Sequence, residues 1–105
     1  MLRVRNMISK ASGREVANQF IIEDDTKSMF QSYNSPIVEI DWANNTINVY
    51  EDWNYSVTTN KYRNAFMEDK GFYDMNNKKG FKKHLELGVI ENCFNREFKV
   101  IKCYE

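Results

Sequence analysis

One histidine and three aspartates are the side chains that could act as a general base or bind a metal ion. His84 is the only histidine; as a general base it would need an acid or a nucleophile beside it, and no flanking pattern supplies one. Asp24, Asp25 and Asp41 carry the oxygen ligands that hard metal ions prefer. Adjacent carboxylates in a turn rarely converge on one ion, and no EF-hand spacing follows them. We therefore predict a structural or surface role for His84, turn positions for the aspartates, and no metal site.

A serine beside a lysine suggests a nucleophile activated by an amine. Ser9 and Lys10 are adjacent, but a lysine base must be buried and desolvated, whereas this one stands in a loop close to Gly13. The sequence contains no phosphate-binding glycine loop, dinucleotide-binding fingerprint or zinc-protease motif. The absence of these motifs favours a protein that is not an enzyme and needs no cofactor, although small nucleases can lack motifs.

The strongest electrostatic feature is a lysine-rich segment in the C-terminal third. Its lysines are Lys78, Lys79, Lys82 and Lys83. Such a ridge could bind phosphates or an acidic protein, and it is also typical of a solvated amphipathic helix. Aromatic rings near basic groups could stack on single-stranded bases, but most rings of a small domain should fill the core. A nucleic-acid-binding module that uses the lysines and exposed aromatics is therefore the alternative function.

A second candidate contact surface is polar and nearly uncharged. Tyr33 lies in the segment FQSYNS, where its neighbours carry hydroxyl and amide groups. The segment SGREVANQ is expected at the same end of the sheet. The predicted polar patch consists of Arg14, Asn18, Gln19, Gln31 and Tyr33. These side chains could instead be satisfied within turns, and a small enzyme built on the patch is a third hypothesis.

Charge is unevenly distributed although the formal net charge is zero. Residues 1–22, 23–57 and 58–105 carry net charges of +3, −6 and +3. The acidic middle segment could mimic phosphates and occupy a nucleic-acid channel, or its charges could lie on solvated strand faces. The carboxylates predicted for the mimic are Glu39, Asp41, Glu51 and Asp52.

The composition predicts one soluble globular domain over residues 1–105. The chain is 42% hydrophobic, 29% charged and 14% aromatic, which argues against disorder. Cys93 and Cys103 fit no zinc or redox spacing, and we expect free thiols. No apolar run is long enough to cross a membrane and no apolar signal core precedes the domain, so a cytoplasmic location is expected.

Hydrophobic periodicity predicts a sheet followed by helices. Strands are expected over residues 2–8, 16–23, 28–33, 36–41, 46–50 and 97–104. A helix should begin with Thr58 or Thr59 as its cap and stop at Gly71. Within it Tyr62 and Phe66 should pack on the sheet, while Lys61 and Arg63 should be exposed. A second helix is predicted over about 77–87, ended by Gly88. The expected fold is α+β, a twisted antiparallel sheet of five to six strands with one or two helices packed on one face.

Three segments together resemble a family of short uncharacterised proteins encoded by phages and prophages. The segments are SGREVANQFII (12–22), FQSYNSPIV (30–38) and DWNYSVTTNKYRNAFM (52–67). The resemblance covers roughly residues 4–67, and the chain departs from the family pattern from about Gly71. The matching positions are Ser12, Gly13, Arg14, Asn18, Gln19, Phe20, Phe30, Gln31, Ser32, Tyr33, Tyr55, Ser56, Thr58, Thr59, Lys61, Tyr62 and Arg63.

The resemblance implies a small binding protein in the cytoplasm of an infected bacterium. Such proteins include anti-CRISPR and other anti-defence inhibitors that block a host complex stoichiometrically, so the leading hypothesis is an inhibitor of a bacterial defence nuclease of the CRISPR type. The partner would be a host protein or ribonucleoprotein complex, with nucleic acid and a homodimer through exposed edge strands left open. The predicted partner-binding residues are Arg14, Asn18, Gln19, Gln31, Tyr33, Glu39, Asp41, Glu51, Asp52, Lys61, Arg63, Lys78, Lys79, Lys82 and Lys83.

Overall fold

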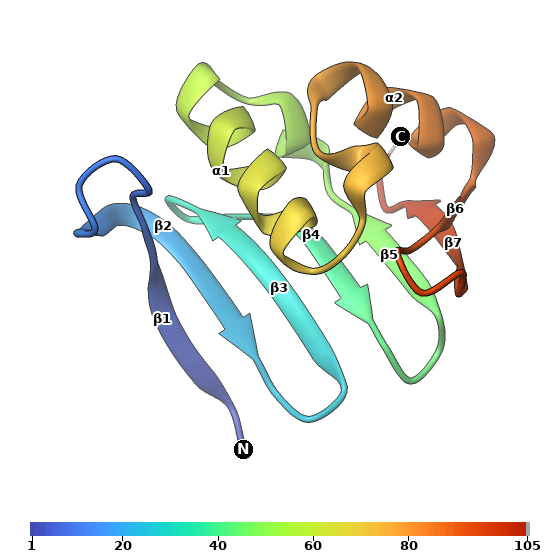
Figure 1. Cartoon of the computed structure of the whole chain (residues 1–105), viewed down its shortest axis with the longest axis horizontal. Helices are drawn as coiled ribbons and strands as arrows, with labels where there is room; N and C mark the ends of the chain where they lie inside the picture. The colour runs from blue at the N-terminus through green and yellow to red at the C-terminus, as the bar shows by residue number, and fades with distance from the viewer. Residues whose placement is uncertain (105) are drawn as a thin grey trace.

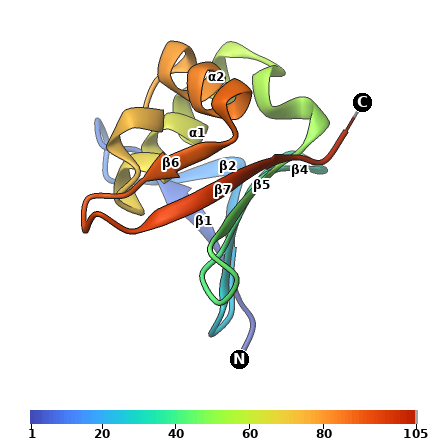
Figure 2. The same ribbon diagram turned by 90° about the vertical axis from the view of Figure 1, so that its right-hand side faces the viewer.

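The computed structural model describes residues 1–104, which form one sheet with two helices on one face (Figure 1). The strands are β1 (Arg3–Ile8), β2 (Glu15–Glu23), β3 (Lys27–Ser32), β4 (Ser35–Asp41), β5 (Thr46–Val49), β6 (Val89–Glu91) and β7 (Glu97–Lys102). The helices are α1 (Val57–Asp69) and α2 (Lys78–Leu87), preceded by the short 3₁₀ turns η1 (Glu51–Asn54) and η2 (Tyr73–Met75). Figure 2 shows both helices on the same side of the sheet.

The sheet has seven strands in the order β1-β2-β3-β4-β5-β7-β6. Neighbouring strands from β1 to β5 are antiparallel, as is the β6–β7 pair, but β5 and β7 run parallel. The α+β class predicted from the sequence is confirmed. The predicted number of five to six antiparallel strands is corrected, because the sheet has seven strands and is mixed. The parallel pair arises because α1, α2 and β6 lie between β5 and β7 in the sequence, which gives the long crossover that parallel neighbours need.

Short polar side chains and glycines set the helix boundaries. Ser56, not Thr58 or Thr59, caps α1, because its Oγ accepts a hydrogen bond from the Thr59 backbone N–H at 3.1 Å. The chain leaves α1 through Gly71, whose φ is +87°, as the sequence predicts. The second helix is capped by Asn77 and ends at Gly88 in the left-handed conformation.

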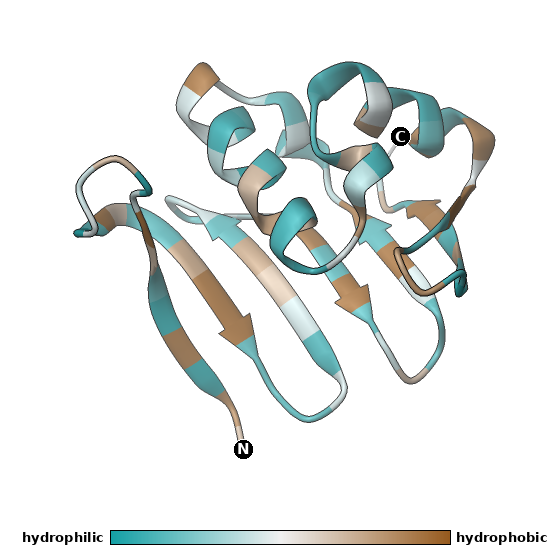
Figure 3. Cartoon of the chain, viewed as in Figure 1, coloured by the Kyte–Doolittle hydropathy of each residue, from teal (hydrophilic) through white to brown (hydrophobic). Residues whose placement is uncertain are grey.

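Aromatic pairs join the helices to the sheet. Phe30 of β3 and Phe66 of α1 stack with centroids 5.9 Å apart, and both are fully buried. Tyr62 is 9% exposed, so the predicted anchoring of α1 by Tyr62 and Phe66 is confirmed. Buried apolar side chains of the strands and helices form one core, and Figure 3 shows apolar positions along the strands that lie beneath the helices. Trp53 stacks on Phe81 of α2 at 5.3 Å and packs against the core.

Arg63 lies inside this core, so its predicted exposure is wrong. Its side chain is fully buried and lies beside the stacked rings of Trp53 and Phe81, 5.4 Å from the Trp53 centroid and 4.6 Å from that of Phe81. The guanidinium donates to the Trp53 carbonyl oxygen at 2.6 Å and to the side-chain oxygens of Asn60 and Asn64 at 3.0 and 2.8 Å. Burial lowers the pKa of Arg63 to about 10, and the group therefore stays charged at neutral pH. Lys61 is exposed, as predicted.

Glu23 ties α1 to the edge of the sheet. Its carboxylate accepts from Lys70 Nζ at 2.5 Å, from Arg5 Nη1 at 2.6 Å and from Ser28 Oγ at 2.7 Å. Burial alone would raise the pKa of this carboxyl, but the hydrogen bonds from Lys70, Ser28 and Arg5 outweigh it and lower the pKa to about 2. The native state therefore favours the ionised form.

We expect Glu23→Gln to reduce the acid sensitivity of folding. Because the native pKa lies below the ordinary value of 4.5, the stabilisation is present above pH 4.5 and is lost as pH falls towards 2. Allowing for solvent screening, the ionised group contributes about 2 kcal/mol. Urea unfolding at pH 6 and pH 3 should show a larger drop in wild type than in the variant. Equal drops would contradict this assignment.

A hydroxyl-rich candidate site at the start of α1

The three sequence segments that carry the family resemblance meet at one end of the sheet. Gln19 of β2 lies directly across from Ser32 of β3, and the Tyr33 backbone N–H donates to the Asn18 carbonyl oxygen at 2.7 Å. Asn18 and Tyr33 have φ values of +65° and +55°, a left-handed conformation that costs free energy in residues other than glycine. The start of α1 lies over this corner, because Ser32 Oγ and Thr59 Oγ1 are 2.9 Å apart in a buried hydrogen bond.

A hollow of about 560 Å³ opens here. We call it the hydroxyl pocket; it is lined by Ser32, Tyr33, Asn34, Ser35, Ile37, Asp52, Tyr55, Ser56, Thr58 and Thr59. The sequence did not predict that these residues form a pocket, although SYNS and YSVTT are the two densest hydroxyl runs at the joins between elements. The fold brings these two runs together through the β3–β4 turn and the η1–α1 junction.

Internal hydrogen bonds hold most of the pocket's hydroxyl groups. Ser56 caps α1 and also donates to Thr59 Oγ1 at 3.1 Å, and Ser35 donates to the Asp52 carboxylate at 2.7 Å. Tyr33 and Tyr55 are 47% and 67% exposed as residues. The corner therefore presents a fixed polar hollow beside two accessible aromatic rings.

The structure gathers most, but not all, of the predicted polar patch. Asn18 is exposed, and Gln31 Nε2 donates to the Tyr33 carbonyl oxygen at 3.0 Å. Arg14 is exposed in the turn that precedes β2, at the same end of the sheet, as predicted.

Gln19 is the exception, because it is fully buried. The β1–β2 register shifts between Asn6 and Ile8, and this irregularity departs from simple strand alternation. The side-chain oxygen and nitrogen of Gln19 have no hydrogen-bond partner among the described residues. Its predicted role as a surface contact residue is therefore wrong.

The acidic residues of the predicted phosphate mimic do not form one surface. Glu51 and Asp52 are in η1, near the start of β4, while Asp41 is at the other end of β4, about 20 Å away along the strand. Asp41 is buried and accepts from the backbone and side chain of Asn44; the hydrogen bond from the Asn44 side chain is the main cause that lowers its pKa. Glu39 accepts from Asn48. Strand geometry thus divides a charge cluster that looks continuous in the sequence.

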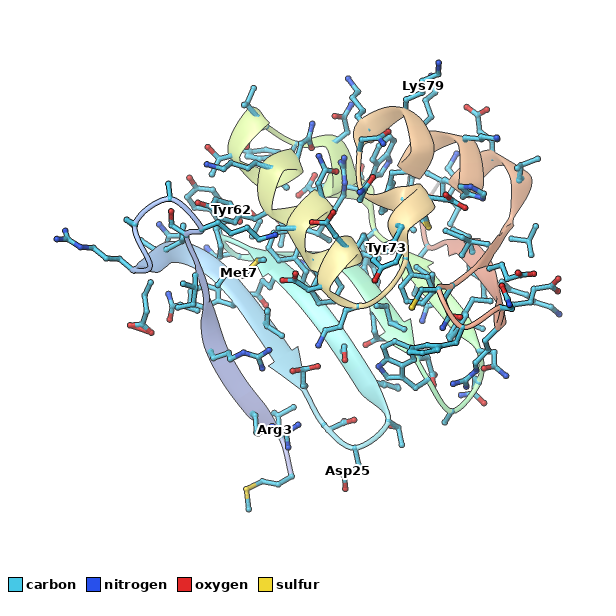
Figure 4. All side chains as sticks on the ribbon, viewed as in Figure 1. Arg3, Met7, Asp25, Tyr62, Tyr73 and Lys79 are labelled. Atoms are coloured by element: carbon cyan, nitrogen blue, oxygen red, sulfur yellow. The ribbon has the colours of Figure 1, made fainter. Side chains whose placement is uncertain are left out.

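The lysine ridge forms as predicted. Its four lysines are exposed along α2, and Lys79 points away from the body of the molecule (Figure 4).

His84 Nδ1 lies 2.9 Å from the Val89 carbonyl oxygen, a structural contact of the kind predicted. Asp24 accepts from the backbone N–H groups of Thr26 and Lys27, which confirms the predicted turn and lowers the pKa of Asp24.

Three further findings concern metals, thiols and membranes. Residues 1–104 contain no group of three or more histidine, cysteine, aspartate or glutamate side chains placed to hold a metal ion. Cys93 and Cys103 are free and exposed. No helix in this part of the chain has the length and apolar character needed to cross a membrane.

The fold and the hydroxyl pocket define a small α+β protein in which a polar corner lies between a sheet and the start of a helix. Residues 3–84 match the family described as "Family of unknown function (DUF8033)", and the chain belongs to this family. The matched region contains the whole hydroxyl pocket and ends within α2, before β6 and β7. No curated protein and no solved structure matches the chain.

Proposed function

We propose that this protein is a non-catalytic binding protein whose contact surface is the hydroxyl pocket with the exposed rings of Tyr33 and Tyr55. The observation that carries the proposal is the meeting of three separate sequence segments at this one corner. Tyr33 adopts a left-handed backbone conformation while the residue stays 47% exposed. A large residue kept at a position that favours glycine, with its ring in solvent, is better explained by binding than by packing.

A protein is the kind of partner that best suits this corner. Tyrosine is enriched at binding hot spots because it offers a large ring and a hydrogen-bonding tip at low entropic cost. Around the two rings the pocket supplies neutral hydroxyl and amide groups and one carboxylate, Asp52, which already accepts from Ser35. Such a surface can pair with backbone and side-chain groups of another protein without desolvating many charges.

The specific form of the proposal is a stoichiometric inhibitor of a bacterial defence nuclease complex of the CRISPR type. Its support is the resemblance to phage-encoded proteins, which points to a host protein or ribonucleoprotein as the partner. Contact through the hydroxyl pocket replaces phosphate mimicry as the mechanism, because the four candidate carboxylates are dispersed. In this form the protein acts by covering a surface of the nuclease complex.

Tyr33→Gly should separate binding from folding. Glycine relieves the left-handed strain at φ +55° while it adds backbone entropy to the unfolded chain, so the free energy of unfolding should change by less than about 1 kcal/mol. Loss of the ring should nevertheless weaken partner binding by tenfold or more, as expected at a hot spot. Urea unfolding measures the first quantity, and surface plasmon resonance with the captured partner measures the second.

The partner can be found by a differential capture experiment. Tagged wild type, Tyr33→Gly and Tyr73→Ala are passed through nuclease-treated bacterial lysate; Tyr73 is 56% exposed in η2, away from the pocket, and is the matched control. A protein retained by wild type and Tyr73→Ala but lost with Tyr33→Gly supports the proposed surface. Equal retention by all three proteins contradicts it. Restored phage plating on a CRISPR-immune host expressing wild type, and not Tyr33→Gly, tests the inhibitor role.

A further inference from the structure

We propose that a second site, between α2 and the C-terminal strand, binds single-stranded nucleic acid. A hollow of about 440 Å³ is lined by Trp53, Lys82, Leu85, Glu86, Lys102 and Tyr104. We call it the lysine–aromatic pocket. It shares no lining residue with the hydroxyl pocket, so this proposal stands independently of the proposed protein contact.

The pocket brings together basic groups from two distant parts of the chain. Lys82 comes from the ridge on α2, and Lys102 is the last residue of β7. Neither ammonium group forms an ion pair with a carboxylate among residues 1–104. Glu86 is the one acidic side chain in the lining. The positive charge at the mouth of the pocket is therefore only partly offset.

The aromatic wall of the pocket is rigid. Trp53 stacks on the buried Phe81 ring at 5.3 Å and donates from Nε1 to the Tyr104 hydroxyl at 2.8 Å. Lys102 Nζ lies over the Tyr104 ring, 4.9 Å from its centroid. Stacking and the hydrogen bond thus hold the two rings in place before any ligand arrives, which lowers the entropic cost of binding.

A buried charge behind the wall adds to the positive field. Arg63 lies against Trp53 at 5.4 Å, and its guanidinium bonds only to neutral oxygens of Trp53, Asn60 and Asn64. No described carboxylate pairs with it. In the low-dielectric interior such a charge is screened weakly, and it favours an anion near the Trp53 ring.

Single-stranded nucleic acid has both chemical features that this pocket can recognise. A phosphate can lie between Lys82 and Lys102, and the adjacent base can stack on Tyr104 next to Trp53. An acidic peptide would satisfy the lysines and leave the aromatic wall unused. Lys78, Lys79 and Lys83 are on the same helix but do not line the pocket, so they add general positive charge and no contact specific to this site.

The test is a fluorescence anisotropy titration of the full chain with a labelled twelve-nucleotide oligothymidylate. Lys82→Ala/Lys102→Ala should weaken binding at least tenfold and lower the slope of log affinity against log salt by about 1.4, because each single-strand phosphate contact contributes about 0.7. The matched control is Lys78→Ala/Lys79→Ala, which removes the same charge from exposed positions outside the pocket. It should weaken binding by less than about threefold.

Stacking of a base on the aromatic wall is tested by tryptophan fluorescence and by variants of Tyr104. In a Trp42→Phe background Trp53 is the sole tryptophan; Trp42 packs on Phe72 and Phe98 and does not line the pocket. Oligothymidylate should quench the remaining fluorescence. Tyr104→Ala should weaken binding roughly tenfold, whereas Tyr104→Phe, which keeps the ring, should stay within about twofold of wild type.

Three outcomes would overturn the proposal. The first is no binding of oligothymidylate at 50 mM salt, and the second is an equal loss in the two double-lysine variants, which would indicate a diffuse charge effect. The third is equal competition by oligoglutamate of the same charge, because a purely acidic ligand would then suffice and the site would be one for an acidic protein.

Discussion

Replacing Arg63 with alanine should lower the free energy of unfolding by about 3–5 kcal/mol, a large share of the stability of a small domain. The guanidinium is fully buried and holds the Trp53 carbonyl oxygen of η1 and two asparagine side chains of α1. Its removal leaves that carbonyl without the Arg63 donor and opens a void beside the stacked Trp53 and Phe81 rings. Both effects destabilise the join between η1, α1 and α2.

Two further variants show which part of Arg63 matters. Arg63→Met keeps most of the volume and loses the hydrogen bonds, and we expect a cost of about 1–3 kcal/mol. Lys61→Ala, two residues away and exposed, should change stability by less than about 0.5 kcal/mol. Urea unfolding followed by circular dichroism gives all three values. If Arg63→Met is as stable as wild type, the buried charge has no net stabilising role, as is known for some buried ion pairs.

Arg63 also shows why its predicted exposure was wrong. The i,i+4 pair of Tyr62 and Phe66 defined the apolar stripe of α1, and a charged residue beside the stripe is normally solvated. Here the aromatic turn η1 and the helix α2 close over that side of α1, so the guanidinium is enclosed by rings from both elements. The enclosure depends on contacts across 10 and 18 residues of sequence, which local periodicity does not describe.

The sheet was predictable where its strands follow one another through short turns. Alternation and the turn residues indicated β1 to β5, because each of these strands pairs with its neighbour in sequence. The strand β6 was missed, since its three residues are too few for a period to appear. The position of β7 beside β5 is set by the path of the chain through α1 and α2. Local sequence patterns do not predict this pairing.

The candidate contact surfaces were likewise predictable only where they depend on neighbouring strands and turns. The polar patch was located in part because its residues sit in turns that a sheet brings to one end, and Asn18, Gln31 and Tyr33 do meet. The prediction of one acidic surface was wrong because Glu39 and Asp41 lie toward the C-terminal end of β4, whereas the two carboxylates of η1 lie near its start. The lysine–aromatic pocket could not be predicted, since it needs η1, α2 and β7 to be placed together.

Gly80→Ala should destabilise the protein by about 2 kcal/mol, although the same change in an exposed helix normally stabilises by about 1 kcal/mol. A Cβ at this position would lie 2.1 Å from the backbone carbonyl oxygen of Asp74 in η2, far inside van der Waals contact. The obstacle is main chain and cannot rotate away, so α2 or η2 must shift. The Asn77 cap, which accepts from the Gly80 N–H at 2.8 Å, would be disturbed as well.

Because α2 carries Phe81 against Trp53, the shift caused by Gly80→Ala should reach the lysine–aromatic pocket. We expect a changed near-ultraviolet circular dichroism signal from Trp53 together with the loss of stability, and weaker oligothymidylate binding than in Lys79→Ala, the neighbouring exposed control. Urea unfolding and the anisotropy titration measure the two effects on the same samples. An alanine variant as stable as wild type would mean that η2 yields at little cost, and α2 would then be held in place mainly by the Phe81 contact with Trp53 and Arg63.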